Sequence, residues 1–537
     1  MTDAVIPASS PDFQQALLAR FDADVAKSVA LSAALCAIPG ITVPAPKADM
    51  DAVLHTFEKT RAAAVQLGLR VLARDADAQH PYPFLIIGFQ DHDLADPNFS
   101  EAVGFIGHID VVPPRQADQF VPVLRGGDLY ARGAADMKTV VASWLVWMER
   151  QQRRSGPKPP VLLLISCCEE NGSDAPHHSE SVMDWLLETH GVTIRFGLVG
   201  ERTGELEWME NPVVGPICKE NRSWRWIRIS QPTATASLDV LHTLAATMKT
   251  LRQEITHLNA QCIPQEKSAR QPGVRSGVVN AFTLLSTEPN AQTATWLQVR
   301  RPPGKAVHAA AANAANASLI ERFSTVAKQA EERFPTVRLG GVRIGQDRNF
   351  NSTDGSGKLW LSIDAPDAEL MAWATSLHAD DMVFSIVPAL PQTQPTRFGL
   401  DIRELLDHQQ RVLEMLSALP NTLPGWDVER INDRPAWRCP KEHPDLMALE
   451  AAYATVVGSP SPDLVKLHGN DGGSLAAIVH RDHPQQARLG AAPAVVFGQV
   501  GKHPHGRDEF HRCESIQPYW DILDHWAASL TAPSSQA

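Results

Sequence analysis

The stretch Val103–Lys138 decides the fold and reads VGFIGHIDVVPP, a gap, and GGDLYARGAADMK. Its apolar run predicts a buried strand that ends near His108 and Asp110, and strand ends are where an α/β sheet presents its chemistry. Asp136 follows in a Gly- and Ala-rich loop before a mainly apolar helical stretch. Imidazole nitrogen and carboxylate oxygen are ligands for divalent metals. Because a single His–Asp pair is also a common structural contact, the interpretation depends on later parts of the chain.

Two further apolar runs lead to acidic residues. VLLLISCC, a predicted strand buried on both faces, is followed by Glu169 and Glu170, and RFGLVG is followed by Glu201. Adjacent carboxylates in a sheltered place repel each other unless a cation is near, although a solvated turn would also accommodate them. Three predicted strands therefore deliver His108, the Glu pair and Glu201 at their carboxyl ends.

The bulk composition limits the class of protein. A chain of 537 residues with 44% hydrophobic and 20% charged residues is expected to form several globular domains. No apolar run is long enough to span a bilayer and no signal-peptide pattern is visible, so a cytoplasmic protein without a membrane partner is expected. The net charge of −12, without a basic patch, predicts no nucleic-acid partner. The seven scattered cysteines predict reduced thiols.

The order of predicted elements divides the chain into three parts. Up to about residue 216 it reads as α/β and begins with one helix over 13–37. From 217 to 432, strand–helix–strand pieces occur twice and indicate an inserted α+β domain. A duplicated and an unduplicated domain both fit, because no residue-level repeat is visible. Within it, PPGKAVHAAAANAAN is predicted as a loop before a helix from residue 317. From 433 to 537 the pattern is α/β again.

Taken together, the motifs GHID, ARGAADMK, the Glu169–Glu170 pair, GERTGE and the late HGRDE resemble the co-catalytic zinc hydrolases. That family includes succinyl-diaminopimelate desuccinylase, acetylornithine deacetylase, aminoacylase, carboxypeptidase G and dipeptidases. The resemblance implies an α/β protein whose catalytic three-layer α/β/α domain (1–216 and 433–537) carries an inserted α+β lid domain (217–432). It also implies two divalent metal ions, with Zn²⁺ expected and Co²⁺ or Mn²⁺ as alternatives.

The resemblance also implies roles for the residues at the matching positions. The implied metal ligands are His108, Asp136, Glu170, Glu201 and His505. Asp136 would bridge both metals, Asp110 would orient the ring of His108, and Glu169 would be the general base. His503 is the rival of His505, but only His505 is followed four positions later by an acidic residue, Glu509.

Further matching residues concern the substrate. His308 in GKAVHAAAANAANA would stabilise the oxyanion of the tetrahedral intermediate, although Ala312 and Ala315 stand where the family usually has Pro and Gly. Arg222 and Arg403 would hold a substrate carboxylate, for which surface ion pairs are the alternative. Asn470 lies at the place of the family's Gly-rich substrate loop.

The expected function is hydrolysis of an amide bond in a small substrate that bears a carboxylate, namely an N-acyl amino acid or a dipeptide. Hydrolytic deamination at the same centre and a catalytically inactive binding module are the alternatives. The inserted region looks nearly twice as long as a simple lid. In the long-lid dipeptidases of the family the second half stands in for a partner subunit, so both a monomer with a pseudo-dimeric lid and a homodimer are expected forms.

Overall fold

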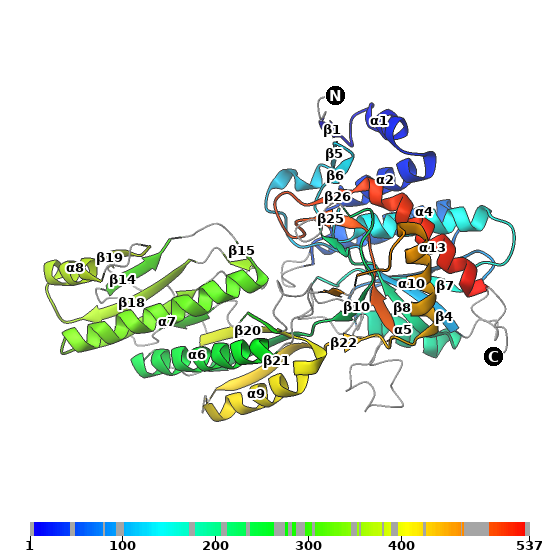
Figure 1. Cartoon of the computed structure of the whole chain (residues 1–537). Coiled ribbons are helices and arrows are strands. Elements are labelled where there is room, and N and C mark those ends of the chain that lie inside the picture. Colours follow the sequence, from blue (N-terminus) through cyan, green and yellow to red (C-terminus); the bar gives the residue numbers. More distant parts are fainter. Residues whose placement is uncertain are drawn as a thin grey trace. The chain divides into compact units, whose positions relative to one another are not determined.

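The chain divides into two compact units, which are visible in the computed structural model (Figure 1). Unit 1 comprises Met1–Arg222 and Ala436–Ala537, and unit 2 comprises Ser223–Pro435. The sequence predicts the boundaries after residues 216 and 432. The structure describes residues 5–42, 49–78, 81–92, 101–170, 178–205, 212–231, 237–261, 274–277, 282–285, 296–302, 307–344, 352–353, 356–377, 381–387, 396–422, 426–462, 464–466 and 493–531.

A large mixed sheet forms the centre of unit 1. Its strands, in spatial order, are β2 (Arg70–Arg74), β3 (Phe84–Gly88), β7 (Val161–Ser166), β4 (Glu101–His108), β8 (Thr193–Val199), β24 (Ala494–Val496), β10 (Cys218–Asn221) and β22 (Trp437–Arg438), with β23 (Leu464–Lys466) beside β10. The four strands β7, β4, β8 and β24 run parallel. Their carboxyl ends therefore meet at one edge of the sheet.

Helices cover both faces of this sheet. The larger core lies under α1 (Phe13–Arg20), α2 (Ala23–Cys36), α3 (Met50–Gln66), α4 (Lys138–Arg153), α10 (Pro444–Val457) and α13 (Ile516–Thr531). The core on the other face contains α5 (His178–His190). Along β4, Val103 and Phe105 belong to the first core and Ala102 and Ile106 to the second, as the two-residue period of a strand requires. The three-layer α/β/α arrangement predicted from the resemblance is confirmed.

A smaller sheet in unit 1 joins the two ends of the chain. It consists of β1 (Val5–Pro7), β5 (Val123–Arg125), β6 (Asp128–Tyr130), β26 (Phe510–Arg512), β25 (Val500–Lys502) and β9 (Gly204–Glu205). The loop that carries Asp136 follows β6, and the loop that carries His505 connects β25 to β26. Because β6 pairs with β26, this sheet brings the two loops together.

Unit 2 contains two halves of the same β-α-β-β-α-β order. The first half is β11 (Trp224–Gln231), α6 (Leu238–Gln261), β13 (Phe282–Leu285), β20 (Thr396–Glu404), α9 (Gln409–Thr422) and β21 (Asp427–Arg434). The second half, inserted after β13, is β14 (Trp296–Arg301), α7 (Ala309–Arg333), β16 (Val337–Ile344), β18 (Gly357–Ile363), α8 (Asp367–Ser376) and β19 (Val383–Val387). The short strands β12 (Val274–Gly277), β15 (Val307–His308) and β17 (Ser352–Thr353) lie outside this pattern.

The strand order of unit 2 shows how the two halves are joined. The sheet runs β19-β14-β18-β16-β13-β20-β11-β21. We number the four strands of each half in chain order. From either outer edge of the sheet toward the middle, they then lie in the order fourth, first, third and second. The junction itself is the antiparallel pair of β13 and β16, the second strand of each half. The inserted domain is therefore duplicated in its topology, although no repeat is visible in the sequence.

Two predicted elements differ in the structure. The single helix expected over 13–37 is two helices, because Asp22 caps α2 by accepting a hydrogen bond from Val25 N at 2.9 Å. Helix α7 begins at Ala309, whereas a loop is predicted up to residue 316. The run AAAANAANA contains no helix breaker, and alanine has the highest helix propensity.

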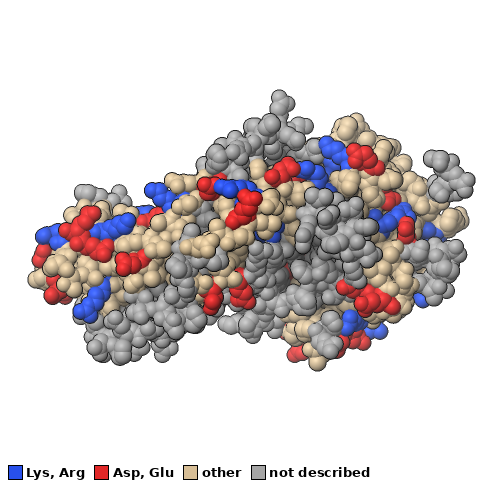
Figure 2. Space-filling model, turned by 90° about the horizontal axis from the view of Figure 1, so that it is seen from below, with Lys and Arg blue, Asp and Glu red and all other residues tan. Residues whose placement is uncertain are grey.

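The surface and the thiols of the described residues agree with the composition. Figure 2 shows Lys and Arg interspersed with Asp and Glu on the face that it presents, without a broad area of one sign among the residues coloured there. No helix in the described part of the chain combines the length and apolar character that a bilayer crossing needs. None of the described cysteines forms a disulfide bond, and all of them are buried.

Candidate metal centre

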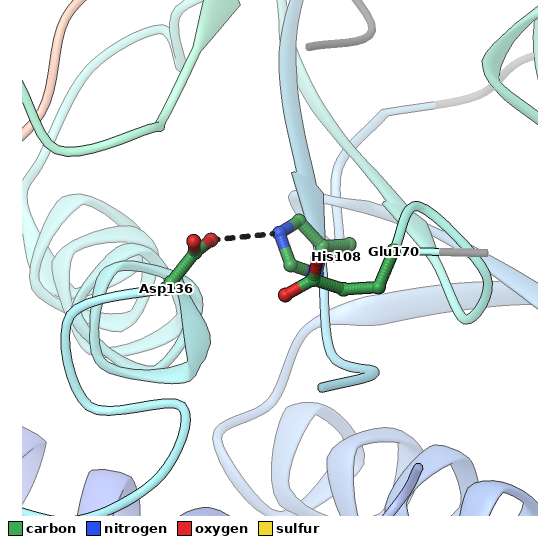
Figure 3. Close-up of side chains that lie close together, drawn as sticks. All are labelled: His108, Asp136 and Glu170. Carbon is green, nitrogen blue, oxygen red and sulfur yellow. Dashed lines mark hydrogen bonds and ion pairs between the residues drawn. The ribbon is translucent and has the colours of Figure 1, made fainter. Parts of the chain in front are cut away.

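The carboxyl ends of three neighbouring strands carry the first residues of the site. His108 is the last residue of β4, Glu169 and Glu170 follow β7, and Glu201 follows β8. Asp136 lies in the loop before α4. Figure 3 shows His108, Asp136 and Glu170 converging from these segments, and one ligand atom from each of the three lies within 4.8 Å of the others.

The carboxylate of Asp136 lies between two histidines. Its Oδ1 is 3.2 Å from His108 Nε2, and its Oδ2 is 3.2 Å from His505 Nε2. His108 Nε2 also lies 3.5 Å from Glu201 Oε1, and His505 Nε2 lies 3.0 Å from Glu170 Oε1. The structure thus brings together all five residues that the resemblance implies as metal ligands, with one oxygen of Asp136 facing each side.

The electrostatics of this cluster favour a cation. Burial opposes protonation of His108, but the hydrogen bonds with Asp110, Asp136 and Glu201 outweigh it and raise the pKa of His108 well above its usual value. Burial also opposes protonation of His505, yet Glu170 and Asp136 raise its pKa to about 10. Both rings would therefore bind a proton where they face the carboxylates.

Asp110 holds the ring of His108 and the backbone of the Glu pair at the same time. Its Oδ1 lies 3.3 Å from His108 Nδ1 and accepts a hydrogen bond from Glu169 N at 3.0 Å. Its Oδ2 accepts hydrogen bonds from Glu170 N at 3.0 Å and from the hydroxyl of Thr42 at 2.6 Å. The His108 contact is the one that the resemblance implies, whereas the contacts to the Glu pair and to Thr42 depend on the tertiary structure.

Glu509 holds the loop that carries Asp136. Its buried Oε1 accepts the backbone N–H groups of Gly133 at 3.0 Å, Ala135 at 3.0 Å and Asp136 at 3.3 Å. Its Oε2 pairs with Arg132, which is also buried. A carboxylate that accepts several backbone bonds and an ion pair fixes the loop around it. The sequence uses Glu509 only to choose between two histidines, and nothing in it identifies Arg132.

The His505 loop is held by side chains from a distant part of the sequence. Arg115 Nε donates to His505 O at 3.2 Å, and Gln119 Nε2 donates to Gly506 O at 2.8 Å. His503 and His505 both have positive φ, 54° and 57°, a region that non-glycine residues seldom adopt. His503 is exposed, whereas the side chain of His505 is 15% exposed and lies against the cluster.

Two glycines precede the ligands of β4 and β8 and let α4 approach closely. A Cβ on Gly200 would lie 2.2 Å from the ring of Trp144, and one on Gly107 would lie 2.8 Å from Met137 Cε. Trp144 is fully buried and donates through Nε1 to the hydroxyl of Tyr519 at 3.0 Å. The indole therefore packs against the backbone directly before Glu201.

The remaining predicted residues are described only in part. Arg222 is buried, with 2% of its surface exposed, at the end of the first segment of unit 1. His308 ends the short strand β15, where it pairs with Ser352, and Arg403 lies in β20 opposite Arg275. Asn470 lies outside the described residues. The roles of these four residues in binding the substrate and stabilising the oxyanion remain predictions.

The residues present fit divalent metal ions. The donors are imidazole nitrogens and carboxylate oxygens, the set that suits Zn²⁺, Co²⁺ and Mn²⁺. Each histidine has a carboxylate neighbour, and Asp136 offers one oxygen to each side. The second nitrogen of His108 faces Asp110, as the second nitrogen of a metal-bound imidazole usually faces a carboxylate or carbonyl.

Curated relatives match part of the chain. Succinyl-diaminopimelate desuccinylase of Thiobacillus denitrificans is 38% identical over 114 residues, which are 20% of this chain and 29% of that protein. The enzyme of the same name from Burkholderia ambifaria is 36% identical over 133 residues, 24% of this chain and 33% of that protein. The matched stretch thus spans less than two thirds of the relatives' length.

Solved structures match nearly the whole chain. Human carnosine dipeptidase 1 aligns over 96% of this chain and 99% of its own, with a TM-score of 0.53 and 15% identity. The M20 family metallo-carboxypeptidase Sso-CP2 of Sulfolobus solfataricus aligns over 93% and 98%, with a TM-score of 0.52 and 12% identity. At these identities the likeness concerns the fold. The model of Peptidase family M20/M25/M40 matches residues 104–529. That match covers more than half of the chain and confirms the resemblance, so the chain belongs to Peptidase family M20/M25/M40.

Proposed function

We propose that this hydrolase cleaves the amide bond of an N-acyl amino acid or a dipeptide-like substrate that bears a carboxylate, with two divalent ions in the centre. The observation that carries the proposal is the position of Asp136 between two His–carboxylate sides. The name of the desuccinylase relatives supports an acyl amide as the substrate. Zn²⁺ is the expected metal, with Co²⁺ and Mn²⁺ as alternatives.

In this proposal the ligands form two sides that share Asp136. His108 and Glu201 would hold one ion, and His505 and Glu170 would hold the other. Asp110 keeps the ring of His108 in place from behind. Divalent ions, when bound here, supply Lewis acidity that lowers the pKa of water and polarises a carbonyl.

Glu169 is the proposed general base. Asp110 accepts hydrogen bonds from the backbone N–H groups of Glu169 and Glu170, so the backbone that carries the two neighbouring carboxylates is held in place. Glu169 takes a proton from the attacking water and later gives it to the leaving amine nitrogen. The products are a carboxylate and an amine, which balances the addition of one water.

Other residues are proposed to bind the substrate. Arg222 and Arg403 would hold its carboxylate, because a guanidinium can bind a carboxylate through two parallel hydrogen bonds. His308 would donate a hydrogen bond to the developing oxyanion. Asn470 would contact the substrate from its loop. Single alanine variants of these residues should raise KM or lower kcat without changing the bound metal.

We also propose that the protein is a monomer with a pseudo-dimeric lid. The second strands of the two lid halves, β13 and β16, already pair with each other inside one chain. Pairing of a second copy through these edges would require that pair to open. Size-exclusion chromatography with light scattering should give the mass of one chain, and the mass of two chains would contradict the proposal.

A panel of acetyl-, succinyl- and aminoacyl-amino acids tests the function. Wild-type protein loaded with Zn²⁺ should release the free amine from at least one member. Glu169→Gln should keep its metal content and lose about 10²–10⁴-fold in kcat, the usual contribution of a general base. Glu188→Gln on the surface of α5 is the control and should retain full activity.

The alternatives give different results in the same assay. A deaminase would release ammonia from amine-bearing substrates and leave amide bonds intact. An inactive binding module would bind metal without turnover. Full hydrolysis by Glu169→Gln would refute the assignment of the base.

A further inference from the structure

Arg202 is a charged residue beside the candidate centre that the proposed mechanism does not use. It directly follows Glu201, and its NH1 lies 3.8 Å from Asp136 Oδ2. That oxygen is the one that faces His505 Nε2 at 3.2 Å, whereas Oδ1 faces His108. The guanidinium therefore lies on the His505 side of the shared carboxylate.

The position of Arg202 is set by packing. Its side chain is 3% exposed. A Cβ on Gly501, in β25, would lie 3.3 Å from Arg202 Cδ and 3.0 Å from Ala135 Cβ, so the Arg202 stem lies close to the backbone of this small sheet. A guanidinium is charged at every physiological pH, and burying that charge is costly without a nearby anion. Asp136 supplies such an anion.

We propose that Arg202 is a built-in cation that weakens binding of the second divalent ion, the one assigned to Asp136 Oδ2, Glu170 and His505. This inference rests on the proposed function, because it takes the two-ion centre as given. A fixed positive charge a few Å from a ligand oxygen repels a divalent ion there and affects the more distant side less. The two ion positions are consequently unequal in affinity.

A substrate-binding role fits Arg202 less well. Its guanidinium already lies beside the carboxylate of Asp136, with which a substrate carboxylate would have to compete. A purely structural role would be visible as lower stability in every metal state. If Arg202 instead tunes the second ion, its loss should have two opposite effects. It should lower the stability of the metal-free protein, because the carboxylates lose a cation, and it should raise the affinity for the second ion.

The test is a titration of the metal-free full chain with Co²⁺, followed by visible absorption and by calorimetry. Wild type should bind two ions in two separate steps. Arg202→Gln and Arg202→Met, which keeps an unbranched stem, should tighten the second step by about tenfold or more and change the first less than about twofold, as expected for removal of a close like charge. Arg202→Lys keeps the charge and should resemble wild type.

Arg512→Gln is the matched control. Arg512 lies in the same unit, and its Nε is also 3.8 Å from a carboxylate, that of Asp128, which is not a candidate ligand. Both binding steps should be unchanged in this variant. Thermal unfolding should show a lower Tm for Arg202→Gln without Co²⁺ and a smaller difference with saturating Co²⁺.

Each result is decisive for one of the two proposals. An unchanged or weaker second step in both neutral variants would overturn the role of Arg202 and leave the two-ion centre intact. The same holds if Arg202→Lys tightened the second step as much as Arg202→Gln. If wild type bound no Co²⁺, the proposed function itself would fail.

Discussion

The two sides of Asp136 are built in different ways. His108 ends a central strand, is 1% exposed, and has its second nitrogen against Asp110. His505 lies in a loop with φ of 57° and has a side chain that is 15% exposed. Its loop is held by Arg115 and Gln119 rather than by a ladder of strand hydrogen bonds. The sheet thus preforms one side, whereas long-range hydrogen bonds assemble the other.

The largest effect is expected where the two sides meet. Asp136→Asn removes the only carboxylate that faces both His108 and His505 among the described residues. Affinity for both ions should fall by more than about a hundredfold, the upper range for loss of an outer partner of a ligand. Metal analysis after desalting measures this. Asp128→Asn is the control, and tight retention of two ions by Asp136→Asn would refute the shared carboxylate.

Glu509→Gln should separate the loop side from the strand side. The change leaves the buried charge of Arg132 without its carboxylate and weakens three backbone contacts of the Asp136 loop. The free energy of unfolding should fall by about 3–5 kcal/mol, as for other broken buried pairs. Chemical denaturation measures it. Glu514→Gln breaks the exposed pair with Arg20 and should cost less than about 1 kcal/mol. Equal effects of the two variants would contradict this account of the loop.

Gly200→Ala tests the strand side. The added Cβ would lie 2.2 Å from the ring of buried Trp144, so the indole or the backbone before Glu201 must shift. Overpacking of this kind costs about 1–3 kcal/mol. The Cβ of Gly104→Ala, on β4, would lie 3.1 Å from methyl groups of Ile194 and Leu164, and this change should cost clearly less. In a Trp144→Leu background the same Gly200→Ala change should cost clearly less, and an equal cost in both backgrounds would argue against the packing explanation.

The smallest effect concerns pH and the sheet that carries the His505 loop. Burial lowers the pKa of His511, in β26, to about 3, and neither ring nitrogen has a hydrogen-bond partner among the described residues. The unfolded chain binds a proton below pH 6.5 and the folded chain does not, so stability is complete above 6.5 and falls as the pH decreases. One unit below that value the loss should be about 1.4 kcal/mol.

Unfolding measured at pH 7.5 and pH 5.5 checks the role of His511. His511→Phe should reduce the difference between the two pH values by about 1.4 kcal/mol. His525→Phe changes an exposed histidine of α13 and should leave the difference unaltered. An identical pH dependence in wild type and His511→Phe would show that His511 does not titrate on unfolding.

The same contrast explains what the sequence could predict. Apolar runs that end in His108, Glu170 and Glu201 are local patterns, and adjacent parallel strands necessarily bring their ends together. His505 was reachable only through the resemblance, because its loop has no regular pattern. Arg132, Gln119 and Thr42 carry no signal of their own, since their partners lie far away in the sequence.

The predicted helix boundaries that were wrong also have local causes. The break between α1 and α2 comes from one cap at Asp22, within a stretch whose apolar spacing fits a continuous helix. The early start of α7 follows from alanine propensity, which the expected loop ignored. The duplication of the lid is visible only in the order of its strands in the sheet, and the identities of the residues do not determine that order.

An anomalous difference map, recorded at the zinc absorption edge from crystals grown with Zn²⁺, tests the central claim most directly. The account predicts two peaks, one between His108 Nε2 and Asp136 Oδ1 and the other between His505 Nε2 and Asp136 Oδ2. A map with no peak beside Asp136, or with His505 turned away from an occupied His108 site, would contradict it.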